Sequence, residues 1–137
     1  KIYKQNGGSM KTRLLVSLLF AFFFIFVSNL SAQTLYFCEG VDDDGYPITD
    51  ASSFTIPDDG GYLYVLIRLP YEVDCSSVRL EIYRNGDYDN TIYVDTEYEW
   101  SWFWKQITFY KRGTYDVYAY DCDDYELASG RVKISFD

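Results

Sequence analysis

The chain has 137 residues, with 12 basic and 21 acidic side chains, no histidine and a net charge of −9. Residues 33–137 hold every acidic residue but only eight basic ones, a net charge of −13, which repels nucleic acid and anionic membranes and favours cations or basic partners. Without histidine the chain lacks the commonest general base, metal ligand and partner of a nucleophile, so we predict a protein that is not an enzyme and has no resident cofactor.

The N-terminal part has the pattern of an export signal. Two basic residues follow Met10, an uncharged run rich in Leu, Phe and Val continues to Leu30, and the segment ends in small residues at Ala32. These are the parts of a secretory signal peptide. Because Leu30 is larger than is usual three residues before a cut, an uncleaved anchor helix stays open as the alternative. The predicted parts are an upstream extension at residues 1–9, a signal peptide at 10–32 and a mature domain at 33–137, secreted, periplasmic or on the cell surface.

After residue 33 the apolar residues recur with a period of two, which indicates β-strands. Val78, Leu80 and Ile82, for example, alternate with charged residues, and no stretch has convincing helical periodicity. A more continuous apolar run at 62–69 favours a strand in the middle of a sheet. We predict strands at residues 35–38, 53–56, 62–69, 78–83, 91–98, 105–109, 114–120 and 131–136.

Short segments that combine glycine with polar residues separate these strands and predict chain reversals. Many short strands at this spacing, without a sequence repeat, are typical of an all-β sandwich or barrel. We therefore predict one all-β domain. The predicted turns are Asp44-Gly45, residues 58–61, Asn85-Gly86, Arg112-Gly113 and Ser129-Gly130.

One tyrosine near the C-terminal end stands in a familiar order of residues. Residues 107–117 read ITFYKRGTYDV, with Asp121 and then Val132-Lys133-Ile134 further on. This order resembles the end of immunoglobulin-like domains of the polycystic kidney disease (PKD) type. The resemblance implies a single antiparallel immunoglobulin-like β-sandwich with a binding or spacer role. It also implies that Tyr115 packs at a corner between strands and bonds to the backbone through its hydroxyl.

The resemblance further implies a disulfide. Cys38, Cys75 and Cys122 all lie in the exported part, where an oxidising compartment favours one bridge and leaves one thiol. In such a sandwich Cys75 lies in the loop between the second and third strands and Cys122 in the loop between the last two, at the same end. The resemblance therefore favours Cys75 with Cys122, leaving Cys38 free or bonded to another chain. The other two pairings stay open.

A cluster of tryptophans is the first candidate binding site. Trp100, Trp102 and Trp104 follow Tyr98, and at strand spacing the three indoles share one face. A row of flat aromatic rings can stack on sugar rings, so these four residues are candidates for carbohydrate recognition. The alternative is that they belong to the core, or to an irregular loop over the edge of the sandwich.

Two acidic clusters are the second candidate. Asp42 and Asp44 belong to the first cluster, and Asp121 and Asp123 to the second. Calcium takes six to eight oxygen ligands, which clustered loop carboxylates can supply. The spacing does not fit the calcium loop of helix-loop-helix proteins. Calcium is therefore a possible ligand of these four residues, and solvated acidic turns are the alternative.

A surplus of tyrosine is the third candidate, with fifteen in the chain. Strand alternation requires that several point outward, where rigid amphipathic rings make good contact residues; the alternative is plain β-propensity. The tyrosines concerned are Tyr62, Tyr64, Tyr83, Tyr93, Tyr118 and Tyr120.

These patterns together predict a secreted, non-catalytic binding or interaction module of the cell envelope or exterior, with a protein or glycan at the cell surface as its partner. No nucleic acid is expected to bind it, and no membrane contact beyond the signal peptide. Two other functions stay open. One is a carbohydrate-recognition domain that uses residues 100–104, with or without calcium. The other is a structural subunit of a surface assembly, joined through Cys38 or an open sheet edge.

Overall fold

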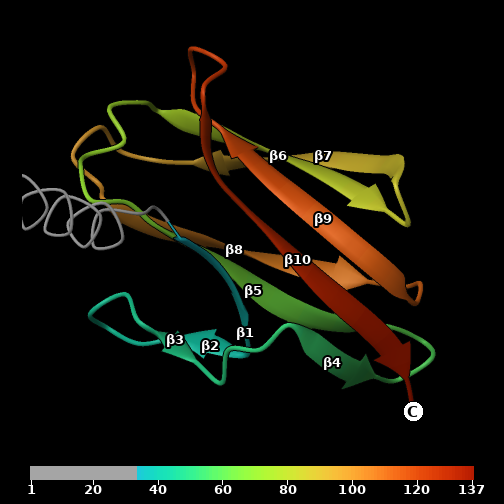
Figure 1. The fold of residues 1–137 in the computed structure, drawn as a ribbon. Coiled ribbons are helices and arrows are strands. Elements are labelled where there is room, and N and C mark those ends of the chain that lie inside the picture. Colours follow the sequence, from blue (N-terminus) through green and yellow to red (C-terminus); the bar gives the residue numbers. More distant parts are fainter. Residues whose placement is uncertain (1–33) are drawn as a thin grey trace, which may run out of the picture. The chain divides into compact units, whose positions relative to one another are not determined.

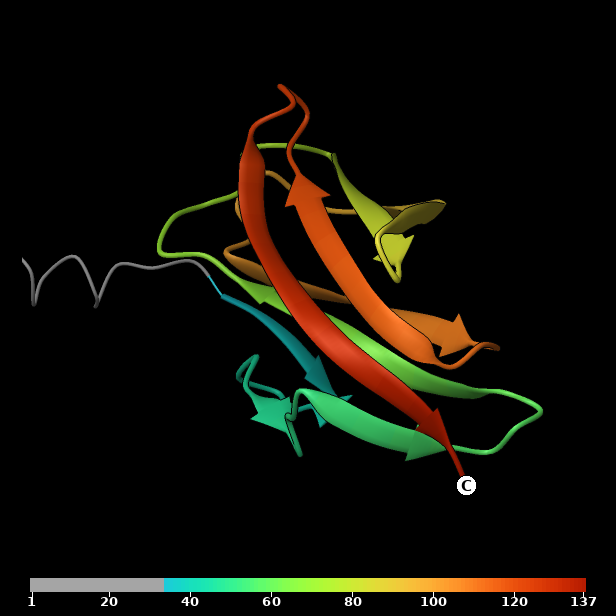
Figure 2. The same cartoon turned by 45° about the vertical axis from the view of Figure 1, so that its right-hand side comes forward.

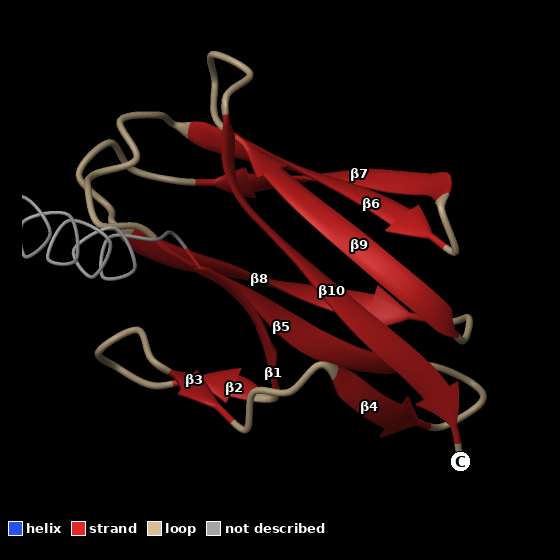
Figure 3. Cartoon of the chain, viewed as in Figure 1, coloured by secondary structure: helices blue, strands red, loops and turns tan. Residues whose placement is uncertain are grey.

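The computed structural model describes residues 34–137, and all of its regular elements are strands (Figure 3). The predicted extension, signal peptide and cleavage site lie outside the described residues. Residues 34–137 contain no helix that is long and apolar enough to cross a membrane.

The strands form two sheets that pack face to face, and a small hairpin lies beside them (Figures 1 and 2). The first sheet has the order β1 (Thr34–Cys38), β5 (Gly61–Arg68), β8 (Trp102–Phe109). The second has the order β4 (Ser53–Ile56), β10 (Glu126–Phe136), β9 (Gly113–Tyr120), β6 (Ser77–Arg84), β7 (Asp87–Asp95). The hairpin pairs β2 (Gly40–Val41) with β3 (Pro47–Ile48). All pairs are antiparallel except β4 with β10, which is parallel.

The core lies between the two sheets and follows the period-two pattern of the sequence. On β5 the alternate residues Leu63, Val65 and Ile67 are buried in it, in agreement with a strand that has neighbours on both sides. On the facing sheet Leu80 lies opposite Ala119, and every predicted inward residue of β6 and β9 is buried. Each fully buried aliphatic side chain of this kind stabilises the fold by about 2 kcal/mol.

Tyr115 occupies the corner that the resemblance implied. Its hydroxyl donates a hydrogen bond of 2.6 Å to the backbone oxygen of Lys111, four residues earlier. Its ring meets Phe109 edge to face at 4.8 Å between centroids, and burial raises the pKa of the phenol. Together with the order of the two sheets, this corner makes the domain an immunoglobulin-like β-sandwich.

The disulfide between Cys75 and Cys122 is confirmed, and Cys38 is the free cysteine. The bridge joins the segment between β5 and β6 to the turn between β9 and β10, at one end of the sandwich. The two cysteines are 47 residues apart, and closing a loop of that length in the unfolded chain stabilises the fold by about 4 kcal/mol at 25 °C.

Predicted strand bounds are wrong at β7, at β8 and at β10, which begins five residues before residue 131, and one predicted turn is wrong. β7 lies about four residues earlier than residues 91–98, and β8 begins three residues before residue 105. Ser129-Gly130 is not a turn but lies inside β10, because the glycine serves a close approach. A Cβ at Gly130 would stand 2.9 Å from the Cδ2 atom of Leu35 on β1. The short hairpin β2–β3 has no apolar alternation and was not predicted.

We expect Tyr115→Phe to lower the free energy of unfolding by about 1 kcal/mol, because it removes the hydrogen bond to Lys111 and leaves the ring in place. Urea unfolding followed by far-ultraviolet circular dichroism measures the change. Tyr62→Phe is the matched control, since Tyr62 is 57% exposed, and its effect should be near zero. Equal effects of the two substitutions would show that the corner hydrogen bond contributes nothing to stability.

Candidate functional site

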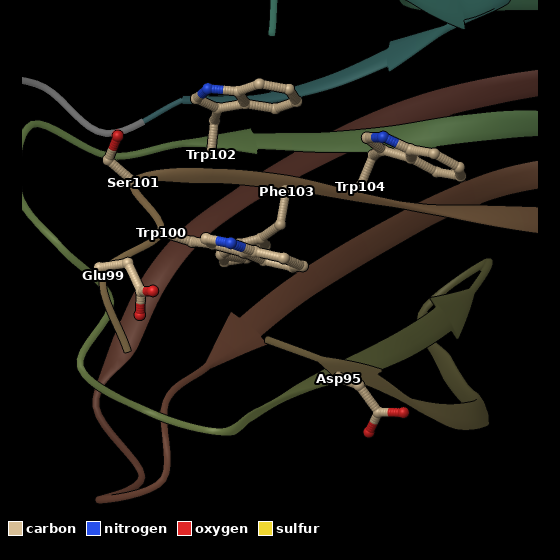
Figure 4. Close-up of a pocket in the computed structure, with 7 residues that line it drawn as sticks. All are labelled: Asp95, Glu99, Trp100, Ser101, Trp102, Phe103 and Trp104. Atoms are coloured by element: carbon tan, nitrogen blue, oxygen red, sulfur yellow. The ribbon is translucent and has the colours of Figure 1, made fainter. Parts of the chain in front are cut away.

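The tryptophan segment does not form a single row. β8 begins at Trp102, while Trp100 lies in the preceding turn, where its backbone N–H donates to the carbonyl of Glu97 at 3.0 Å. Figure 4 shows Trp102 and Trp104 on one side of β8 and Trp100 on the other, beside Phe103. The prediction that three indoles share one face is therefore wrong for Trp100, because strand alternation does not extend into the turn.

Trp102 is held by the first acidic turn. Gly45 lies against its indole, so that a Cβ on Gly45 would stand 2.3 Å from the Cδ2 atom of Trp102. Arg68, the register partner of Trp102, donates to the backbone oxygens of Asp44 and Gly45. Its guanidinium lies 4.1 Å from the ring centroid of Tyr46, a distance that favours a cation–π contact. The first acidic turn thus packs against the indole of Trp102.

Trp104 is the exposed indole of this face, at 46%. The ring of Tyr64 meets it edge to face, at 5.2 Å and 79°, and Tyr62 meets Tyr64 at 6.1 Å and 88°. Adjacent rings therefore stand perpendicular to one another. Tyr98 is also exposed, but it lies in the turn before β8, where its carbonyl accepts the N–H of Asp74.

The two acidic clusters are two copies of one turn. One side-chain oxygen of Asp42 accepts the N–H groups of Asp44 and Tyr46, both at 2.9 Å. In the same way Asp121 accepts from Asp123 at 2.8 Å and from Tyr125 at 3.0 Å. The first aspartate of each cluster therefore shapes its own loop.

Calcium binding by these two acidic turns stays a prediction. Among residues 34–137 no three Asp, Glu or Cys side chains are grouped so that they could hold a metal ion. The structure does not bring Asp42 and Asp44 together with Asp121 and Asp123 in one centre, and each pair stays in its own turn.

Five tyrosines share the outer side of the five-stranded sheet, and we call this surface the tyrosine face. They lie on three neighbouring strands, β7, β6 and β9, and the strand register places them on the same side. The ring of one member, Tyr83, meets Tyr88 edge to face at 5.9 Å and Tyr118 at 5.8 Å. Two members are 61% exposed, Tyr88 and Tyr93. The members are Tyr83, Tyr88, Tyr93, Tyr118 and Tyr120.

Charged groups fix the tyrosine face in place. Arg79 pairs with Glu81 at 2.9 Å and with Asp124 at 2.7 Å, and its guanidinium lies 4.7 Å from the ring centroid of Tyr120. Desolvation, followed by the charge of Glu81, raises the pKa of the phenols of Tyr83 and Tyr120. Both hydroxyls are protonated at neutral pH. That of Tyr83 donates to Glu81 at 3.4 Å, and that of Tyr120 can donate a hydrogen bond to a partner. Sequence alternation indicated outward tyrosines, but only the strand order brings these five together.

Cys38 is fully buried, but outside the main core. Its alternation places it with Leu66 on the outer side of the three-stranded sheet. The thiol donates to the carbonyl of Tyr64 at 3.6 Å and lies near the backbone of Gly40 and Ile48 in the small hairpin; burial raises its pKa. The hairpin thus closes over the thiol, and a bridge to another chain would need the hairpin to move.

Gly45→Ala should lower the free energy of unfolding by about 2–3 kcal/mol. The residue has a φ of 82° and no room for a Cβ beside Trp102, so strain and overpacking add. Gly86→Ala is the matched control, since Gly86 has a φ of 89° with open space around it, and it should cost about 1 kcal/mol. Denaturant unfolding of both variants decides, and an equal cost would contradict the packing of Gly45 on Trp102.

Cys38 should not react with a maleimide reagent in the folded protein and should react promptly in denaturant, because a buried thiol of raised pKa forms little thiolate. Mass spectrometry counts the added labels.

The raised pKa of the Cys38 thiol also makes stability depend on pH, because the folded protein favours the protonated thiol. This contribution to the free energy of unfolding is full below the ordinary thiol pKa and is lost as the pH rises through the pKa of the folded state. Cys38→Ala should remove that alkaline loss, and rapid labelling of the folded protein would contradict the burial.

Comparison with known proteins finds no match to any protein-family model and none to any curated protein. Among solved structures, the chain is similar to the CARDB domain of the PF1109 protein from Pyrococcus furiosus, in complex with di-metal ions, at 13% identity. That match covers 77% of this chain and 93% of the other, with a TM-score of 0.42. A superoxide reductase (neelaredoxin) variant from Ignicoccus hospitalis is similar at 13% identity, over 81% and 86%, with a TM-score of 0.43.

Proposed function

We propose that the mature domain is an exported, non-catalytic module that binds a partner protein through the tyrosine face. The observation that carries the proposal is the interlocked set of rings on β6, β7 and β9, in which Tyr83 contacts both Tyr88 and Tyr118. Tyrosines already held by their neighbours lose little side-chain entropy on binding. Such residues dominate the energy of many protein interfaces.

The charges around these rings favour a protein partner. Arg79 and Arg131 each pair with a carboxylate, at 2.7 Å to Asp124 and to Asp116 respectively. A hollow of about 330 Å³ is lined by Tyr83, Tyr118 and Tyr120, together with Asp116 and Gly86. Mixed charges around aromatic rings match the polar rim and aromatic centre of protein interfaces.

The other aromatic surface supports a glycan partner less well. Trp102 is partly covered by Gly45, and the rings of Trp104, Tyr64 and Tyr62 are successively perpendicular. Stacking on consecutive sugar rings needs at least two coplanar rings that face the solvent. Recognition of a single sugar at Trp104 is the second function that this surface supports, because its indole is exposed.

The proposal includes a location outside the cytosol and a place among PKD-type immunoglobulin-like domains. The disulfide supports an oxidising compartment outside the cytosol, which agrees with the signal peptide predicted at residues 10–32. The corner formed by Tyr115 is shared by many immunoglobulin-like domains, and the order of residues 107–117 favours the PKD type among them. Such domains serve as binding or spacer modules, and the absence of histidine supports a function without catalysis.

A photo-crosslinking residue at position 93 should give a discrete protein adduct when the exported protein meets the envelope and extracellular fractions of its source organism. The same residue at position 110 should give none, because Tyr110 is also well exposed but lies outside the tyrosine face. Once the partner is identified, Tyr83→Ala and Tyr93→Ala should each weaken binding by about 2 kcal/mol, roughly 30-fold.

Two outcomes would contradict this proposal. The first is equal adducts at positions 93 and 110, or none at either. The second is saturable binding on a glycan array that Trp104→Ala abolishes and Tyr93→Ala leaves unchanged, with the fold intact in both variants. That result would assign the function to the outer side of the three-stranded sheet, and loss of glycan binding with a chelator would add calcium to it.

A further inference from the structure

A groove of about 560 Å³ runs along the first half of β8 and the turn before it (Figure 4). It includes Trp104, which the glycan alternative would also use, and Asp95, which follows Tyr93 of the tyrosine face by two residues on β7. It is lined by two acidic residues, by Ser101 and by four aromatic residues, and by no basic residue; the acidic and aromatic residues are Asp95, Glu99, Trp100, Trp102, Phe103 and Trp104.

The groove lies where both sheets end. β8 is the last strand of the three-stranded sheet and β7, which ends at Asp95, is the last strand of the other. In residues 34–137 no further strand pairs with the outer edge of either. An edge strand presents alternate backbone N–H and C=O groups that an added strand can bind. Side chains on the two sides of β8, Trp100 with Phe103 and Trp102 with Trp104, frame this edge.

Backbone hydrogen bonds hold Trp100 in position before any ligand arrives. The N–H of Val73 donates to the carbonyl of Trp100 at 2.7 Å, and Leu69 donates to Ser101 at 2.8 Å. Asp74 donates to Tyr98 at 2.9 Å, and the segment that provides these donors ends at the disulfide. A site built on such a fixed turn loses little entropy on binding.

The chemistry of the groove selects a cation. The indole of Trp100 is 41% exposed, and tryptophan is the best aromatic partner for a guanidinium or ammonium group. Two acidic residues line the same groove, and the net charge of −13 on residues 33–137 attracts basic segments over a longer range. The edge strand β7 of a second copy is a poor ligand, because it contains three aspartates and no basic residue.

We propose that this groove binds an extended basic segment of a partner protein. The segment pairs with the free edge of β8 and places an arginine or lysine side chain against Trp100, near Asp95 and Glu99. This second site does not depend on the tyrosine face, and it gives the predicted open sheet edge a specific ligand.

The test is a titration of the ¹⁵N-labelled exported protein with the peptide acetyl-Thr-Arg-Val-Arg-Thr-amide, followed by NMR. The indole N–H signals are assigned with Trp100→Phe, Trp102→Phe and Trp104→Phe. We expect saturable shifts of the Trp100 indole and of the β8 amides. Replacing both arginines of the peptide by neutral citrulline should weaken binding at least tenfold, and so should methylation of alternate peptide amides.

Variants separate this site from the tyrosine face. Trp100→Ala and the double variant Asp95→Asn with Glu99→Gln should each weaken binding about tenfold. Tyr88→Ala, near the opposite end of β7 from Asp95, should leave binding of this peptide unchanged, so failure here is distinct from failure of the tyrosine face. Equal affinity for the citrulline peptide, or no saturable shift up to millimolar peptide, would overturn the proposal. Equal binding by the methylated peptide would overturn the pairing with β8.

Discussion

The disulfide between Cys75 and Cys122 is the constraint on which both candidate surfaces depend. On one side it anchors the segment after β5, whose backbone holds the turn that carries Trp100. On the other side it fixes the acidic turn before β10, from which Asp124 pairs with Arg79 and so positions that guanidinium over the tyrosine face. One covalent bond thus orders the end of the sandwich where loops from both sheets meet.

The two aromatic surfaces differ in what their rings are used for. On the three-stranded sheet the first acidic turn packs on Trp102, so less of that indole is left for a partner. On the five-stranded sheet Tyr83 contacts Tyr88 and Tyr118, and both Tyr88 and Tyr93 stay 61% exposed. An aromatic count alone therefore does not identify a binding surface, because packing decides which rings remain for a partner.

Much of the fold could be predicted from the sequence, because alternation along β5, β6 and β9 is a local signal with a direct structural cause. The role of Tyr115 and the cysteine pairing followed from a resemblance confined to the last part of the chain. The tyrosine face could not be predicted, because it depends on which strands are neighbours. The turn predicted at Ser129-Gly130 was wrong for a similar reason. In the sequence, a glycine that makes room for a neighbouring strand, here β1, cannot be told from a glycine that forms a turn.

The burial of Cys38 bears on how a chain with three cysteines reaches one bonded form. In the unfolded chain all three pairings are open to oxidation. Once β1 pairs with β5 and the small hairpin closes, the thiol of Cys38 is withdrawn from exchange, while Cys75 and Cys122 are brought together. The fidelity of oxidation is then a property of the fold, because the folded three-stranded sheet buries the competing thiol.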